Sequence, residues 1–238
     1  MSLLSVLAVF PYVATIQSEV LKAVPLPIGV ILVVQLVQSA ILFSLAIFIG
    51  LLLARKTNFR MPILESLASR GDYKQAVKNI SYSPIVLGIL VAVAIYATDY
   101  LFTMHGAKLS TSQNLAPIWQ KLLAAFYGGI TEEILMRLGL MTMFTWTLAK
   151  LMRQRSPSLF VVIISIIVSA IIFGLGHLPI TASLTAITPL IVLRAIVLNG
   201  IGGVVFGWLY YRRGLESAMV AHFTADIFLL TLLPLFVG

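Results

Sequence analysis

Six long apolar stretches run through this 238-residue chain and restrict it to folds that cross a membrane. Each is long enough to span the hydrocarbon core, which takes roughly 17–25 apolar residues in a helix. The stretches lie at residues 28–54, 84–104, 117–149, 159–176, 189–211 and 215–237. Only 10% of the residues are charged, whereas soluble domains have roughly a quarter. We therefore predict an all-α fold, a polytopic transmembrane helix bundle with about 6–8 membrane helices.

The chain is predicted to form a single membrane domain over residues 1–238, because it contains no internal repeat and no low-complexity linker. Residues 1–116 supply the N-terminal spans, and residues 117–230 contain the helices with most of the unusual polar residues. Residues 1–15 are apolar but lack a basic n-region and a small-residue cleavage site. We expect a short span or an interfacial helix there, not a cleaved signal peptide.

Most of the 16 basic residues lie between the apolar stretches, at 55–78, 150–155 and 212–213. By the positive-inside rule these segments face the cytoplasm, which makes residues 55–83 a cytoplasmic loop and residues 105–116 an outer loop. No basic face is interleaved with base-stacking aromatic residues, so we expect membrane lipids and not nucleic acid as partners. The absence of cysteine excludes disulfides, thiolate catalysis and zinc–cysteine sites.

Ionisable side chains inside the apolar stretches are the second unusual feature. A charge at mid-membrane costs about 2.5–3.5 kcal/mol on insertion scales, so such residues usually face the bundle interior and serve a function. The residues with this placement are Asp99, Glu132, Glu133, Arg137, His177, Arg194, His222 and Asp226. Asp99 and Arg194 match no motif and are interpreted as a structural pair. The other six are candidate site residues.

Spacing indicates how the first three candidates are arranged. Glu133 and Arg137 are four residues apart, hence on one helix face and able to form an ion pair. Glu132 is turned by about 100° from Glu133, so both glutamates are not expected to point at the same spot. We expect Arg137 to hold one glutamate while the other faces a cavity.

Two later helices repeat the four-residue spacing, with Phe173 and His177 on one and His222 and Asp226 on the other. Carboxylates and imidazoles together suit hydrolysis. A glutamate can take a proton from water and return it to a leaving amine, and a histidine can donate a hydrogen bond to a developing oxyanion. Two histidines and one glutamate with an open position also form a familiar catalytic zinc set.

These residues form three motifs in chain order: EExxxR at 132–137, FxxxH at 173–177 and HxxxN/D at 222–226. Each motif is weak alone. The ordered set on three membrane helices resembles the CPBP intramembrane protease family, which includes type II CAAX prenyl proteases and bacteriocin-processing or immunity proteins. The resemblance implies an intramembrane endopeptidase that hydrolyses a peptide bond in a membrane-associated or lipidated protein substrate.

The resemblance also implies a role for each residue. Glu132 would be the water-activating base, assisted by His177. Glu133 would pair with Arg137 and hold the helix, and His222 would stabilise the oxyanion.

Asp226 would complete the oxyanion-stabilising pair with His222, but it departs from the Asn of many eukaryotic prenyl proteases. Aspartate donates a hydrogen bond only when it is protonated, so it must otherwise act by orienting His222. A second interpretation of the family makes Glu132, His177 and His222 ligands of a metal ion, with zinc as the candidate.

The spans as predicted place the candidate site residues at different depths in the membrane. Straight single crossings place Glu132 and His177 far from the basic side, but His222 only about two turns from Arg213. The depths match if the segment 117–149 kinks, or if the loop after His177 dips into the membrane.

Two other functions stay open on the residues alone. A non-enzymatic membrane immunity or scaffold protein would use the same side chains to bind a peptide or a membrane partner. A proton-coupled transporter would use buried carboxylates as a relay, although no inverted repeat supports it. The short chain and short loops favour a prokaryotic cell membrane.

Overall fold

In the computed structural model of the chain, residues 2–80, 82–108 and 116–234 are described, and their regular secondary structure is helical. Six of these described helical segments are long and apolar enough to cross a membrane. They are Ile28–Thr57, Ser83–Met104, Ile118–Leu151, Leu159–Ala182, Pro189–Arg213 and Leu215–Leu232. The predicted all-α polytopic bundle is therefore confirmed, and the protein is an integral, multi-pass membrane protein.

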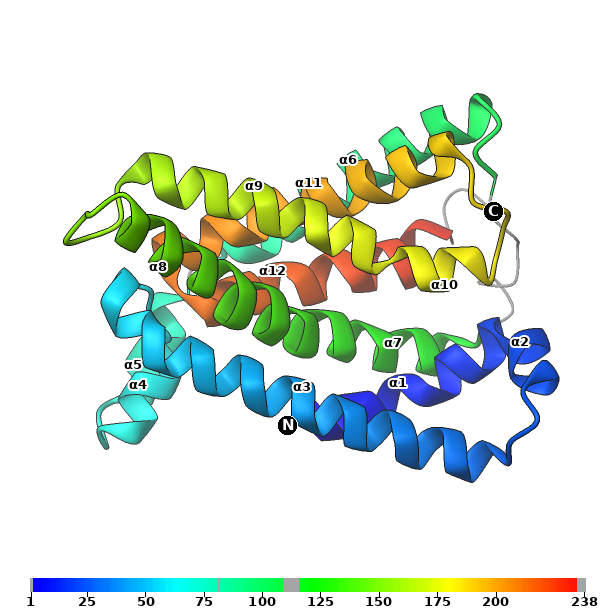
Figure 1. Cartoon of the computed structure of the whole chain (residues 1–238), viewed down its shortest axis with the longest axis horizontal. Coiled ribbons are helices and arrows are strands. Elements are labelled where there is room, and N and C mark those ends of the chain that lie inside the picture. The colour runs from blue at the N-terminus through cyan, green and yellow to red at the C-terminus, as the bar shows by residue number, and fades with distance from the viewer. Residues whose placement is uncertain (1, 81, 109–115, 235–238) are drawn as a thin grey trace.

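The long helices run side by side along the molecule (Figure 1). α11 packs against α9, α12 packs against α6 and α11, and α1 packs against α7. The elements in chain order are α1 (Ser2–Ile16), α2 (Ser18–Ala23), α3 (Ile28–Thr57), α4 (Pro62–Ala68), α5 (Tyr73–Asn79), α6 (Ser83–Met104), α7 (Ile118–Phe126), two π-helical stretches (Tyr127–Glu132 and Ile134–Met141), α8 (Thr142–Leu151), α9 (Leu159–Gly176), α10 (Leu178–Ala182), α11 (Pro189–Arg213), α12 (Leu215–Ile227) and a further π-helical stretch (Phe228–Leu232).

Local sequence signals set several helix ends. Ser158 and Thr188 cap α9 and α11, because their hydroxyls accept hydrogen bonds from backbone N–H groups in the first turn. Prolines in the first turns of α4, α6 and α11 have no N–H to leave unpaired. Gly214 joins α11 to α12 at a φ of 98°, and a Cβ there would lie 2.4 Å from Cδ of Pro62. The positive φ and the lack of space for a Cβ therefore both require glycine at this turn.

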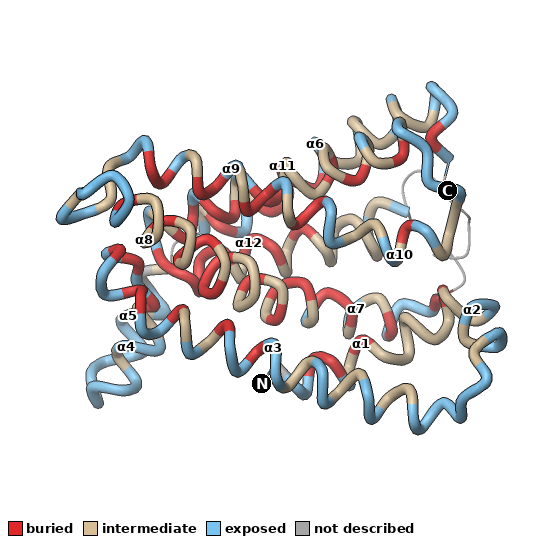
Figure 2. Tube along the Cα trace, viewed as in Figure 1, coloured by how far each residue is buried: buried red, intermediate tan, exposed pale blue. Residues whose placement is uncertain are grey.

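Burial is concentrated on the inner faces of the helices (Figure 2). Only 17% of the most apolar window of α3 is buried, so most of its aliphatic side chains face the surroundings, as lipid-facing residues do. A cluster of buried side chains extends from the middle of the bundle to the α11–α12 turn. It includes Met141, Phe206, Tyr210 and Leu215, each at most 2% exposed.

The N-terminal stretch forms α1, an apolar helix of 15 residues that is shorter than the six spans. The predicted loop 55–83 contains the short helices α4 and α5. The predicted outer loop 105–116 includes residues 109–115, which lie outside the described residues, as do residues 235–237 of the last predicted span.

The conflict in predicted depth is resolved by the position of the α11–α12 turn. The Leu215 N–H donates to the Arg60 carbonyl at 3.0 Å, and Oε1 of Glu216 accepts from the N–H groups of Ile63 and Leu64 at 2.9 and 3.0 Å. The loop before α4 and the first turn of α4 therefore cover the start of α12. The α8–α9 connection projects beyond this turn (Figure 1). α12 thus begins inside the bundle, and His222, about 10 Å further along it, reaches the level of the glutamates.

Candidate active site

Glu133 and Arg137 form an ion pair in the centre of the bundle. Both side chains are 0% exposed, and Nε of Arg137 donates to Oε2 of Glu133 at 3.2 Å. Glu133 lies between the two π-helical stretches, a backbone form that is frequent at functional sites. The predicted pairing of one glutamate with Arg137 is therefore present, and the paired glutamate is Glu133.

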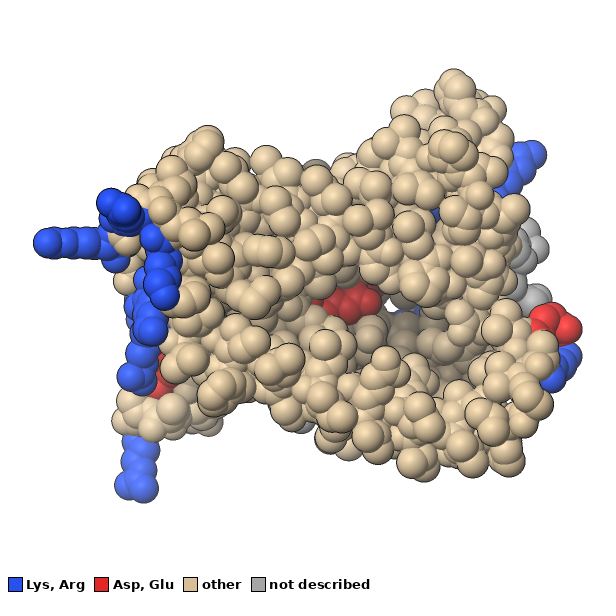
Figure 3. Space-filling view, viewed as in Figure 1, with Lys and Arg blue, Asp and Glu red and all other residues tan. Residues whose placement is uncertain are grey.

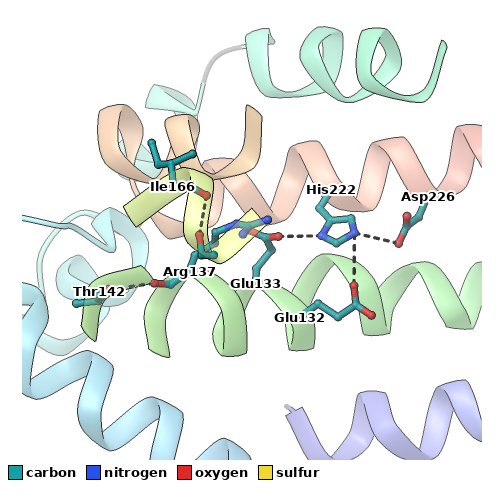
Figure 4. Close-up of polar contacts among 8 residues, drawn as sticks. Glu132, Glu133, Arg137, Thr142, Ile166, His222 and Asp226 are labelled. Carbon is teal, nitrogen blue, oxygen red and sulfur yellow. Dashed lines mark hydrogen bonds and ion pairs between the residues drawn. The ribbon is translucent and has the colours of Figure 1, made fainter. Parts of the chain in front are cut away.

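The same glutamate holds His222 of α12. Nδ1 of His222 lies 2.9 Å from Oε1 of Glu133, and the ring is buried. Because an ionised carboxylate only accepts hydrogen bonds, Nδ1 carries the proton of this bond. Arg137, Glu133 and His222 thus form a chain that fixes the ring and leaves Nε2 facing the opposite direction (Figure 4).

Glu132 and Asp226 flank that free nitrogen. Oε2 of Glu132 lies 3.8 Å from Nε2 of His222, and Oδ2 of Asp226 lies 3.7 Å from it (Figure 4). Their side chains are 20% and 22% exposed, in contrast to the buried Glu133. Both distances exceed that of a hydrogen bond, so Nε2 remains free to form a hydrogen bond with a third oxygen placed between the carboxylates.

The two glutamates point at different atoms, as helix geometry predicted, but both reach the ring of His222, one at each nitrogen. The ring is wide enough that two side chains about 100° apart on one helix can approach its opposite edges. The second part of that expectation also holds, because Glu132 faces a cavity while Glu133 is held by Arg137.

His177 lines the same cavity from the end of α9. Its Nδ1 lies 2.8 Å from the carbonyl oxygen of Phe173, so Nδ1–H donates and Nε2 keeps a lone pair. Phe173 stands edge-on to His177, with ring centroids 4.7 Å apart, and 6.0 Å from the His222 ring. Within the described part of the chain, a shared cavity and Phe173, not a hydrogen bond or ion pair, connect His177 to the cluster.

Phe173 also supports Arg137, whose guanidinium carbon lies 5.6 Å from the ring centroid. Nη1 and Nη2 of this buried arginine have no hydrogen-bond partner among the described residues. The cation–π contact partly offsets the cost of burying them. The first residue of the FxxxH motif therefore stabilises the last residue of the EExxxR motif.

The cavity has a volume of about 810 Å³. Its polar lining includes Glu132, His177, Arg194, His222 and Asp226, and most of the remaining lining is aliphatic or aromatic. A space of this size, largely apolar with a few convergent polar groups, is typical of a binding site for a sizeable ligand.

Sequence reasoning missed three residues that build the site. A Cβ at Gly128 would lie 2.0 Å from Oδ2 of Asp226, and one at Gly129 would lie 2.7 Å from Cβ of Phe223. The two glycines therefore let α12 approach the glutamate helix. Phe206 stacks on His222 with centroids 4.6 Å apart, and no motif marked it.

The predicted metal ligands Glu132, His177 and His222 line the same cavity. No group of three or more His, Asp or Glu side chains is arranged to hold a metal ion among the residues that the structure describes. One of the three expected ligands, His222, has Nδ1 committed to Glu133, and its Nε2 is 3.8 Å from the nearest oxygen of Glu132. Zinc at Glu132, His177 and His222 therefore stays a prediction, and no step below is routed through a metal ion.

Asp99 and Arg194 form a second ion pair, as interpreted from the sequence. Nε and Nη2 of Arg194 lie 2.6 and 2.5 Å from Oδ1 of Asp99. The pair joins the far end of α6 to the beginning of α11, away from the glutamates, although Arg194 lines the cavity.

Fold and site together define the class of this protein: a polytopic α-helical membrane protein with a buried Arg–Glu–His chain and two further carboxylates at a cavity. Residues 114–228 match the family model of the type II CAAX prenyl endopeptidase Rce1-like proteins. This part of the chain is therefore a domain of that family, and the resemblance inferred from the three motifs is confirmed. Comparisons with curated proteins and with solved structures found no significant match.

Proposed function

We propose that this protein is an intramembrane endopeptidase that hydrolyses a peptide bond in a membrane-associated or lipidated protein. The observation that carries the proposal is the placement of Glu132 and Asp226 around the free Nε2 of His222 at the cavity wall. Membership of a prenyl endopeptidase family supports a protein substrate with a lipid group.

The proposed reaction begins with a water molecule beside Glu132. Glu132 takes a proton from this water, whose oxygen attacks the carbonyl carbon of the scissile bond. His177, with its Nε2 lone pair on the cavity side of the cluster, assists by orienting the water. When His222 holds both ring protons, Nε2–H donates to the oxyanion of the tetrahedral intermediate. The C–N bond then breaks, and Glu132 returns the proton to the leaving amine.

The remaining residues position these groups. Glu133, held by Arg137, fixes the ring plane of His222 through Nδ1. Asp226 faces the same Nε2 as Glu132 and orients that nitrogen toward the substrate, a role that does not require it to be protonated. Because the ion pair is fully buried, the geometry is set before substrate binds, which is the property that makes electrostatic stabilisation effective.

The test is cleavage of a prenylated peptide by the purified protein in liposomes. We expect Glu132→Gln, His177→Ala and His222→Ala each to reduce cleavage at least about 100-fold, the usual contribution of a general base or an oxyanion donor. His105→Ala is the matched control. Its Nδ1 lies 2.8 Å from the carbonyl of Leu101, as that of His177 does from Phe173, but it is exposed and outside the cavity lining. Wild-type cleavage that survives all three site substitutions would overturn the proposal.

Elemental analysis of the same preparations tests the metal interpretation. Stoichiometric zinc that is lost in Glu132→Gln and in His222→Ala would support a metal-dependent hydrolase. If wild type binds the peptide without cleaving it, and Glu132→Gln binds equally well, the non-enzymatic immunity or scaffold role is favoured instead.

A further inference from the structure

Arg194 is an ionisable residue inside a span, and the proposed reaction does not use it. Its side chain is 12% exposed and lines the cavity, whereas the side chain of its partner Asp99 is 35% exposed and is not part of the lining. In the described part of the chain, no other lysine or arginine lines the cavity. The positively charged member of the ion pair is therefore the one that faces the cavity.

Asp99 uses only part of the hydrogen-bonding capacity of this guanidinium. Nε and Nη2 of Arg194 both lie on a single oxygen of Asp99, Oδ1, at 2.6 and 2.5 Å. Nη1 has no hydrogen-bond partner among the residues that the structure describes. Because a guanidinium carries five N–H donors in a rigid planar fork, Asp99 holds the group in place without occupying all of them. The donors of Nη1 remain available to a ligand.

Opposite charges stand at the two ends of the cavity. Glu132 and Asp226 flank His222, and Phe206 of α11 stacks on the His222 ring with centroids 4.6 Å apart. Arg194 precedes Phe206 by twelve residues on α11, which corresponds to about 18 Å along the helix. The cavity is therefore negatively charged beside His222 and positively charged at its other end.

One face of α11 connects the two ends. Between Arg194 and Phe206 the cavity is lined by uncharged residues at helical spacing, Ala195, Leu198, Asn199 and Gly202. An extended peptide covers about 3.3–3.6 Å per residue, so this face has room for about five residues. In Figure 3 the surface is hollowed over the middle of the bundle, with acidic atoms visible at the bottom of the hollow. A peptide chain can therefore lie along α11 from His222 toward Arg194.

We propose that Arg194 binds a carboxylate of the substrate that lies within about five residues of the scissile bond. The inference rests on the proposed function, because it names a feature of the substrate of that same site. An arginine fork matches a carboxylate in both geometry and charge. Glu132 and Asp226 repel a further carboxylate beside them, so the two charged ends fix the direction in which the substrate lies along α11. The carboxylate belongs either to the C-terminus of the substrate or to an acidic side chain.

Binding of three prenylated peptides to the purified protein in liposomes distinguishes these sources. The first peptide has no acidic residue and ends in a free carboxylate a few residues after the scissile bond. The second is its C-terminal amide, and the third is the same amide with a glutamate as its last residue. Affinities are measured with Glu132→Gln present in every variant, so that the proposed base is absent and the peptides stay intact.

We expect the amide without glutamate to bind at least about tenfold more weakly than one or both carboxylate peptides, because it lacks a hydrogen bond between charged groups. Arg194→Gln should abolish this preference, whereas Asp99→Asn should retain it. A purely structural ion pair predicts the same effect for both substitutions, since either one breaks it. Lys22→Gln is the matched control, because Lys22 is also paired with an acid, Glu19, but is exposed and outside the lining.

Equal binding of all three peptides would overturn the proposal, as would a preference that persists in Arg194→Gln. If Arg194→Gln does not fold, the double substitution with Asp99→Asn takes its place, because it leaves no unpaired charge. Binding with Glu132→Gln does not require catalysis. A carboxylate preference in a protein whose wild type cleaves no peptide would therefore refute the proposed function and leave the carboxylate site standing.

Discussion

Substituting Gly128 by alanine is expected to inactivate the site without unfolding the protein. The added Cβ would lie 2.0 Å from Oδ2 of Asp226, and ordinary contact begins at 3.4 Å, so the carboxylate must move by about 1.4 Å. This oxygen is now 3.7 Å from Nε2 of His222. Since a misplacement of about 1 Å can reduce a rate about 100-fold, we expect kcat/KM for peptide cleavage to fall by about that factor.

The expected effect on stability is small, for two reasons. Alanine favours a helix over glycine by about 0.5–1 kcal/mol. Moving the Asp226 side chain off its rotamer costs about 0.5–1.5 kcal/mol, which offsets that gain. The unfolding temperature in detergent should therefore stay close to that of the wild type.

The neighbouring glycine provides the comparison. A Cβ at Gly129 would lie 2.7 Å from Cβ and 3.0 Å from Cα of Phe223, so the backbone of α12 must shift. Overpacking of this kind costs about 1–3 kcal/mol, and Gly129→Ala should unfold at a lower temperature. Gly200→Ala, with no atom within 4 Å of the new Cβ, should behave as wild type in both assays. Full activity of Gly128→Ala, or unfolding as early as Gly129→Ala, would refute the assignment of Gly128 to the close approach of Asp226.

Three further substitutions test separate contacts. Arg137→Met leaves Glu133 buried without its cation and should lower the free energy of unfolding by about 3–5 kcal/mol, seen as a lower unfolding temperature; a change below about 1 kcal/mol would contradict the pairing. Asp99→Asn should lower the free energy of unfolding by about 1.5–3 kcal/mol, less than Arg137→Met, because the Asp99 side chain is 35% exposed. The double substitution with Arg194→Gln should recover part of this loss. Strict additivity of the two single effects would argue against the ion pair. Glu216→Gln should leave cleavage intact but speed proteolysis at α4, whose first turn Glu216 holds by two backbone hydrogen bonds. Unchanged proteolysis would show that these bonds do not anchor α4.

The sequence alone determined the membrane fold and indicated which residues gather in the candidate site. Apolar runs of about 20 residues admit few structures in lipid, so the six spans were predicted to within a few residues. The three motifs placed five of the six candidates in one connected cluster, because four-residue spacing on a helix sets a shared face. The ion pair of Asp99 and Arg194 was also predictable, since buried charges need partners.

Contacts between helices decided the rest, because they depend on depth and approach and leave no periodic signal. The sequence did not predict that both glutamates reach one imidazole, that Gly128 and Gly129 admit α12, or that Phe206 stacks on His222. Nor did it predict that the α11–α12 turn is covered, which places His222 at the level of the glutamates. The direction in which the cavity extends was decided by packing as well.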